Sequence, residues 1–210
     1  MKKFELTSET KINIFGKKLF RIKALISFGD VEAGETGGWV EKEGNVNQSG
    51  DAWVSGDAEV SGNAKVYGNA KVSGNAKVYG DAWVSGNAEV YGNAKVYGDA
   101  WVYGNTEVYG NAKVYGDAWV YGNTKVYGDA WVYGNAEVSG NADYTTIHGF
   151  GTQFRTTTFF RCKDKKVRVA CGCFFGTIPE FREQVKNTRK GKIAEEYLMI
   201  ADLMEKHFEK

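Results

Sequence analysis

The stretch Gly50-Asp51-Ala52-Trp53-Val54-Ser55 is the first copy of a six-residue phrase that recurs without a gap as far as Ser139. Its general form is Gly-Asn/Asp-Ala-X-Val-Tyr/Ser, and the ninety residues 50–139 hold fifteen copies, with Thr in place of Ala in two of them. Self-similarity at a short fixed period is typical of a solenoid, because one hexapeptide cannot bury an apolar face and gains stability only by stacking. The repeat therefore decides the fold.

Each copy reads as one short strand and one corner. In Ala64-Lys65-Val66-Tyr67, small, charged, branched and aromatic residues alternate, which is the period of a strand with Ala64 and Val66 pointing inward. The Gly68-Asn69 pair that follows favours a turn, because Gly and Asn tolerate positive φ. The sequence thus predicts a mainly β chain.

The phrase resembles that of the hexapeptide-repeat superfamily. The resemblance implies a left-handed parallel β-helix of triangular section with about 18 residues per coil. In a coil of this length, residues eighteen apart stack, so Trp83, Trp101 and Trp119 form one column. A coil of twelve residues would instead place Trp101 outside the column that holds Trp83 and Trp119. Three ladders are predicted: Trp83, Trp101 and Trp119; Lys77, Lys95 and Lys113, followed by Trp131; and Trp53, Lys71, Glu89, Glu107 and Lys125.

The flanking segments are expected to close the coil, because a solenoid end exposes apolar side chains and unpaired backbone. We divide the chain into an N-terminal β cap (1–43), the solenoid (44–143) and a C-terminal unit (144–210). In the cap, residues 11–15 and 19–22 predict a β-hairpin, and Trp39-Val40 is expected to enter the first coil.

The C-terminal unit is predicted to be ββαα. Residues 152–162 and 167–173 read as two strands across a turn at 163–166. The capping-box phrase Thr177-Ile178-Pro179-Glu180 predicts a helix to about Asn187, and residues 193–208 have apolar residues at helical spacing.

The segments before and after the repeat resemble a narrower group of proteins than the repeat does. It rests on Phe20-Arg21-Ile22-Lys23-Ala24-Leu25, Phe28-Gly29-Asp30-Val31, Gly37-Gly38-Trp39-Val40-Glu41, Thr156-Thr157-Thr158-Phe159-Phe160-Arg161 and Cys171-Gly172-Cys173-Phe174. These segments resemble hexapeptide-repeat proteins encoded by bacteriophages and prophages, and related bacterial hexapeptide acyltransferases. The resemblance implies a protein acting inside a host cell and raises acyl transfer as one activity.

The composition limits the compartments in which the protein is expected to act. The net charge is +1, but residues 144–210 hold thirteen basic and eight acidic residues. No apolar run is long enough to span a membrane, and no signal-peptide core follows Met1-Lys2-Lys3. Three cysteines, an odd number, fit a reducing compartment. We expect a cytoplasmic protein with no membrane contact and no cofactor.

Acyltransferases of the superfamily use a His as general base near a coil edge, often with a loop that interrupts the repeat and forms a pocket. Both histidines, His148 and His207, lie outside the repeat, and no loop interrupts it. His148 is the one candidate base. The uninterrupted coil favours a non-catalytic scaffold, because a pocket needs a break in the repeat.

Two further hypotheses concern the C-terminal unit. Cys162, Cys171, Cys173 and His148 supply S and N donors for Zn²⁺, or the cysteines simply pack in the hairpin. Cations among aromatic residues could contact nucleic acid or a host-defence protein, or could form a solvated face. The candidate contacts are Arg155, Arg161, Lys163, Lys165, Lys166 and Arg168.

The coil itself supplies the predicted binding surface. It combines the Trp83/Trp101/Trp119 ladder, flanked by Tyr103 and Tyr121, with the ladder of Lys77, Lys95 and Lys113. Exposed aromatic strips either stabilise themselves by stacking or mark interfaces. We expect a scaffold that binds a host or phage protein, and a homo-oligomer, with a trimer favoured, formed through the aromatic face.

Overall fold

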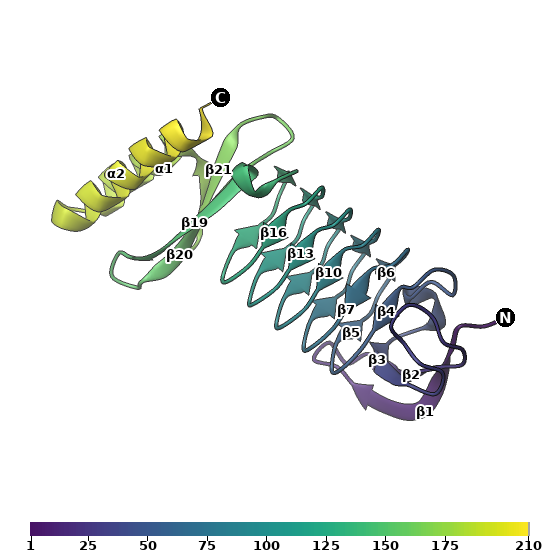
Figure 1. Cartoon of the computed structure of the whole chain (residues 1–210). Coiled ribbons are helices and arrows are strands. Elements are labelled where there is room, and N and C mark those ends of the chain that lie inside the picture. The colour runs from purple at the N-terminus through teal and green to yellow at the C-terminus, as the bar shows by residue number, and fades with distance from the viewer. Residues whose placement is uncertain (210) are drawn as a thin grey trace.

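The computed structural model describes residues 1–209 and is a β-solenoid closed at both ends (Figure 1). A β cap covers one end of the coil, and a sheet backed by two helices covers the other. The N- and C-terminal ends of the chain lie at opposite ends of the molecule.

Three parallel sheets form the sides of the coil. The tryptophan face holds β6 (Lys65–Val66), β9 (Trp83–Val84), β12 (Trp101–Val102), β15 (Trp119–Val120) and β18 (Glu137–Val138). The lysine face holds β5 (Glu59–Val60), β8 (Lys77–Val78), β11 (Lys95–Val96), β14 (Lys113–Val114) and β17 (Trp131–Val132). The mixed face holds β4 (Trp53–Val54), β7 (Lys71–Val72), β10 (Glu89–Val90), β13 (Glu107–Val108) and β16 (Lys125–Val126).

The register confirms all three predicted ladders. Trp101 pairs with Trp83 on one side and Trp119 on the other. The lysine and mixed ladders keep the same spacing: Lys77, Lys95, Lys113 and Trp131; Trp53, Lys71, Glu89, Glu107 and Lys125. The coil therefore has eighteen residues per turn along these ladders.

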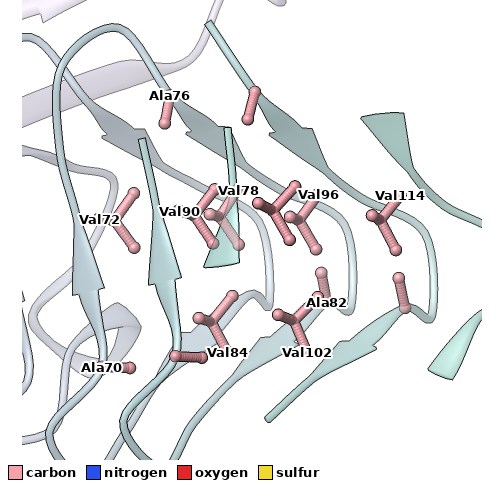
Figure 2. Close-up of a cluster of buried hydrophobic side chains, with 14 of the residues drawn as sticks. Ala70, Val72, Ala76, Val78, Ala82, Val84, Val90, Val96, Val102 and Val114 are labelled. Carbon is pink, nitrogen blue, oxygen red and sulfur yellow. The ribbon is translucent and has the colours of Figure 1, made fainter. Parts of the chain in front are cut away.

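The core of the coil is a column of valine and alanine side chains (Figure 2). The valines from Val54 to Val138 are fully buried. Thr106 and Thr124 replace alanine in two copies and are also buried. Their hydroxyls donate to the carbonyl oxygens of Tyr103 and Tyr121 at 2.8 and 2.6 Å, so these buried polar groups are satisfied.

The N-terminal cap is a hairpin joined to the first coil by a third strand. β1 (Phe4–Ile12) and β2 (Lys18–Ala24) are antiparallel, which confirms the predicted hairpin with a longer first strand. β3 (Thr36–Val40) pairs with β2 and, in parallel, with β5. The predicted entry of Trp39-Val40 into the coil is thus confirmed.

The first coil is longer than the others. Trp39 lies opposite Glu59, and Val46 opposite Val66, so this coil has two extra residues. They fall between Val46 and Val54, after the 3-10 helix η1 (Glu43–Asn45). The insertion includes Gln48, whose Oε1 accepts hydrogen bonds from the backbone amides of Lys3 and Phe4 at 2.7 and 3.2 Å. The extra residues therefore attach the chain's first strand to the coil.

The C-terminal unit has four antiparallel strands where the sequence predicted two. They are β19 (Tyr144–Phe150), β20 (Arg155–Arg161), β21 (Val167–Cys171) and β22 (Phe174–Thr177), after the 3-10 helix η2 (Asn141–Asp143). The predicted first strand began too early, because residues 151–154 form the turn between β19 and β20. Gly172, with φ of 61°, lies in the turn between β21 and β22.

The two predicted helices are confirmed as α1 (Ile178–Thr188) and α2 (Gly191–Phe208). The capping box is present, because Thr177 accepts from the amide of Glu180 and the Glu180 side chain accepts from the amide of Thr177.

The sheet is a layer between the coil and the helices. Phe160 packs on the end of the coil core, whereas its neighbour Phe159 packs with the helices. This alternation along β20 follows from the two-residue period of a strand. The side chains of the sheet therefore fix the helices and the coil on opposite faces.

Candidate binding surfaces

The tryptophan face carries an exposed aromatic strip. The rings of Trp83 and Trp101 stack with centroids 5.2 Å apart and an interplanar angle of 7°, and those of Trp101 and Trp119 with centroids 5.7 Å apart. The three residues remain 40, 41 and 36% exposed. Stacking thus orders the rings without burying them.

Tyrosines border the strip on one side. Tyr67 lies against Trp83 with centroids 5.5 Å apart, and Tyr103 stacks on Tyr121 at 5.0 Å. The Tyr121 hydroxyl donates to Glu137 Oε1 at 3.0 Å. Desolvation raises the pKa of both Tyr103 and Tyr121, so the hydroxyls stay protonated as donors.

The turn between β20 and β21 packs against the C-terminal end of the tryptophan face. Lys163 Nζ lies 4.1 Å from the ring centroid of Trp119 and donates to the carbonyl of Asp117 at 2.9 Å. Lys165 pairs with Glu137 at 2.8 Å, and this bond lowers the pKa of the Glu137 carboxyl. The basic turn is thus held against the coil.

The lysine face presents stacked cations. Lys77 pairs with Glu59 at 3.0 Å, and Lys113 Nζ lies 4.3 Å from the centroid of Trp131. Lys95 stands between them and has no carboxylate partner within residues 1–209. Beside this ladder four tyrosines stack at 4.6 to 4.8 Å: Tyr79, Tyr97, Tyr115 and Tyr133.

A groove of about 710 Å³ opens where the lysine face meets the C-terminal sheet. The coil contributes Lys113 and Trp131 to it, and the β19–β20 hairpin contributes His148, Phe154 and Arg155. Asn111, Asp129, Gln153, Thr156 and Cys173 also line the groove. It therefore brings together residues that the sequence assigned to four separate hypotheses: the binding surface, acyl transfer, the zinc site and nucleic-acid contact.

The six predicted nucleic-acid contacts are not one cluster. Arg155 lies in the groove at the start of β20, but the others lie at the far end of β20, in the β20–β21 turn and at the start of β21, where four of them hold partners of their own. Besides Lys163 and Lys165, Arg161 pairs with Asp143 at 3.3 Å and Arg168 with Asp164 at 2.7 Å. Lys166 has no acidic partner among the described residues. The basic stretch therefore mainly anchors the C-terminal unit.

The structure does not bring the four candidate zinc ligands together. In residues 1–209 no three His, Cys, Asp or Glu side chains come together as metal ligands. Cys162 is buried against the end of the coil, where burial raises the pKa of its thiol to about 11. Cys171 ends β21, and Cys173 is exposed beyond the Gly172 turn. β21 ends between Cys171 and Cys173, so the two thiols do not share one face of a strand.

His148 is placed on an open surface. It is exposed, and its Nδ1 lies 3.0 Å from Thr156 Oγ1. In the part of the chain that the structure describes, no carboxylate contacts the ring to orient it as a base. Trp131 was not among the predicted site residues, although it follows Lys113 in its ladder. Phe154 is one of the aromatic residues that lie among the cations in the sequence, so the sequence already indicated it as a residue that could stack on a base.

No protein-family model and no curated protein matches the chain. Among the described residues, neither helix has the length and apolar character needed to cross a membrane.

Proposed function

We propose that the chain is a non-catalytic binding scaffold that engages protein partners through the tryptophan face. One observation carries the proposal: three tryptophans lie in register on one side of a regular coil, stacked yet more than a third exposed. Rings that are already ordered lose little conformational freedom on binding, so burying them contributes roughly 25 cal/mol per Å² at small entropic cost.

The first partner is a further copy of the chain, in a homotrimer packed side by side along the coil axes. The other two faces carry charged residues at most of the same positions, such as Lys95 and Glu89, and are poorer surfaces for an apolar contact. The resemblance to phage proteins extends the proposal to a host or phage macromolecule in the cytoplasm as the target of the assembled scaffold. Three free cysteines support that compartment.

Light scattering on the wild type and on a Trp101→Lys/Trp119→Lys variant tests the interface. Lysine already occupies the same ladder at Lys65, so the coil tolerates it there. We expect a trimeric wild type and a monomeric variant. The control, Glu89→Lys, places a lysine on the mixed face and should leave the trimer intact. A monomeric wild type, or a trimer that survives the double substitution, contradicts the proposal.

A scaffold should show no turnover. We expect no transfer of an acyl group from acyl-coenzyme A to sugars or amines, measured by release of free thiol. Turnover that disappears in His148→Ala but persists in the control His207→Ala would replace the scaffold with an acyltransferase.

A further inference from the structure

The groove at the end of the lysine face has unpartnered positive charge. Arg155 and Lys95 have no carboxylate partner within residues 1–209, and Lys95 lies one coil below Lys113 in the same ladder. The one carboxylate that lines the groove, Asp129, already accepts a hydrogen bond from Asn111 Nδ2 at 3.0 Å. The groove and the ladder leading to it therefore favour a ligand with several anionic groups.

Two aromatic rings stand among these cations. Trp131 is 37% exposed and Phe154 is 66% exposed. Phe154 also has φ of 48°, a left-handed conformation that is costly for a bulky side chain. Because its ring is largely exposed, burial of the ring does not offset that cost. Strained residues of this kind cluster at ligand sites.

The shape of the groove separates classes of ligand. It is an open groove rather than an enclosed cavity, and it continues into the lysine ladder of the coil. A duplex would contact the cations through its phosphates and leave the rings unused. A single strand uses both, because its phosphates follow a basic track while its unpaired bases stack on aromatic rings.

We propose that this groove and the adjoining lysine ladder bind a short single-stranded nucleic acid, with phosphates on Lys95, Lys113 and Arg155 and bases on Trp131 and Phe154. The site lies on the lysine face and the C-terminal hairpin, so it is independent of the proposed contact through the tryptophan face.

Fluorescence anisotropy with a labelled oligodeoxythymidylate of about ten nucleotides tests the proposal on the full chain. We expect binding whose logarithm falls with the logarithm of salt concentration with a slope of about −2, since three cations each contribute roughly −0.7. Arg155→Glu should weaken binding at least about tenfold and make the slope shallower.

Phe154→Gly is the more informative variant. It removes the ring and also the strain, because glycine adopts φ of 48° freely. We expect an unchanged or higher melting temperature together with binding weakened about tenfold. Two controls match the chemistry away from the groove: Lys166→Glu for charge, and Phe15→Ala, on the N-terminal hairpin, for an exposed aromatic ring. Both should bind like the wild type.

Three results would overturn the proposal. The wild type could fail to bind the oligonucleotide at low salt, Lys166→Glu could weaken binding as much as Arg155→Glu, or thymidine monophosphate could compete as well as the strand at equal nucleotide concentration. The last result would assign the groove to free nucleotides. Loss of the trimer in the tryptophan variant bears on none of these outcomes.

Discussion

At the scale of the residue, the corner glycines meet two separate demands. Gly86 has φ of 70°, and a Cβ added there would lie 2.9 Å from the backbone nitrogen of Gly104 in the next coil. The first demand is conformational, because left-handed backbone is unfavourable for other residues. The second is spatial, because stacked corners bring backbone against backbone.

Gly86→Ala should therefore destabilise the protein by more than the left-handed conformation alone costs. That cost is about 1–2 kcal/mol, and the contact with Gly104 adds to it because the neighbouring atom is backbone and cannot rotate away. Urea unfolding followed by circular dichroism measures the change.

Substitutions at two matched glycines separate the conformational cost from the cost of the contact between coils. Gly16 has φ of 74° but open space around an added Cβ, so Gly16→Ala should cost only the conformational part. Gly140 has an extended backbone with φ of −164° and equally open space, so Gly140→Ala should stabilise by about 0.4–1 kcal/mol. Equal effects at Gly86 and Gly16 would mean that coil contact contributes nothing.

At the scale of the element, the hydrogen bonds that join successive coils outside the two-residue strands all run in one direction. The amide of Trp83 donates to the carbonyl of Ala100 in the next coil at 2.9 Å, and the other copies repeat this bond. The first coil is therefore left mostly with free carbonyl groups and the last coil mostly with free amides. An unpaired backbone group that is buried costs about as much as a lost hydrogen bond.

Side-chain donors satisfy carbonyl groups at the N-terminal end of the coil. Lys3 Nζ donates to the carbonyls of Gly50 and Ala52 at 3.0 and 2.8 Å. Asn45 Nδ2 donates to those of Gly62 and Ala64 at 3.1 and 2.9 Å. Burial lowers the pKa of Lys3 to about 8, so the ammonium of this cap is less costly to deprotonate than an exposed lysine.

Side-chain acceptors satisfy the last coil, one on each face. Asn141 Oδ1 accepts from the amide of Lys125 at 2.8 Å, Thr158 Oγ1 from that of Trp131 at 3.1 Å, and Asp143 Oδ2 from that of Ser139 at 3.0 Å. The two ends of the coil are therefore capped by opposite chemistry.

Asn45→Asp tests the donor cap. The substitution keeps the size of the buried side chain but replaces the Nδ2 donor with a carboxylate oxygen that faces two carbonyl oxygens. We expect a loss of about 3 kcal/mol in the free energy of unfolding. Asn47→Asp is the control, because Asn47 uses Oδ1 to accept from Ser49 and keeps that role as a carboxylate. It should change stability by less than about 0.5 kcal/mol.

The individual elements also show which parts of the structure could be predicted from the sequence. The ladders followed from the period, because a six-residue phrase fixes both alternation and stacking. β19 was missed because its Thr-Thr-Ile-His-Gly run, between the repeat and Gly151, lacks a clear strand pattern. The groove could not be predicted, because Trp131 and Phe154 lie on separate elements that meet only when the sheet packs on the last coil. Arg155 and Lys166 are close in sequence, yet they lie at opposite ends of β20 and are separated by the length of that strand.

At the scale of the whole molecule, the caps prevent the coil from extending itself. Residues 50–139 are ninety residues, or five coils of eighteen, so the two ends of this segment match in phase. Its amide end presents donors and its carbonyl end presents acceptors in the same triangular arrangement. Such a head-to-tail contact does not close on itself and generates a filament.

We therefore expect residues 50–139 alone to form filaments in which each copy continues the coil of the last. Both ends are bare in this fragment, and each new junction would pair free amides with free carbonyls and bury valine and alanine. Electron microscopy and fibre diffraction measure the outcome, with a repeat of about 4.7–4.8 Å along the filament axis. Residues 1–139 are the matched control, because they keep the bare amide end while Lys3 and Asn45 still occupy the carbonyl end. Two amide ends present mostly donors to one another and cannot continue the coil, so this fragment should form no filaments even if it aggregates without order. Filaments from residues 1–139 as readily as from residues 50–139 would show that the N-terminal cap does not block the carbonyl end.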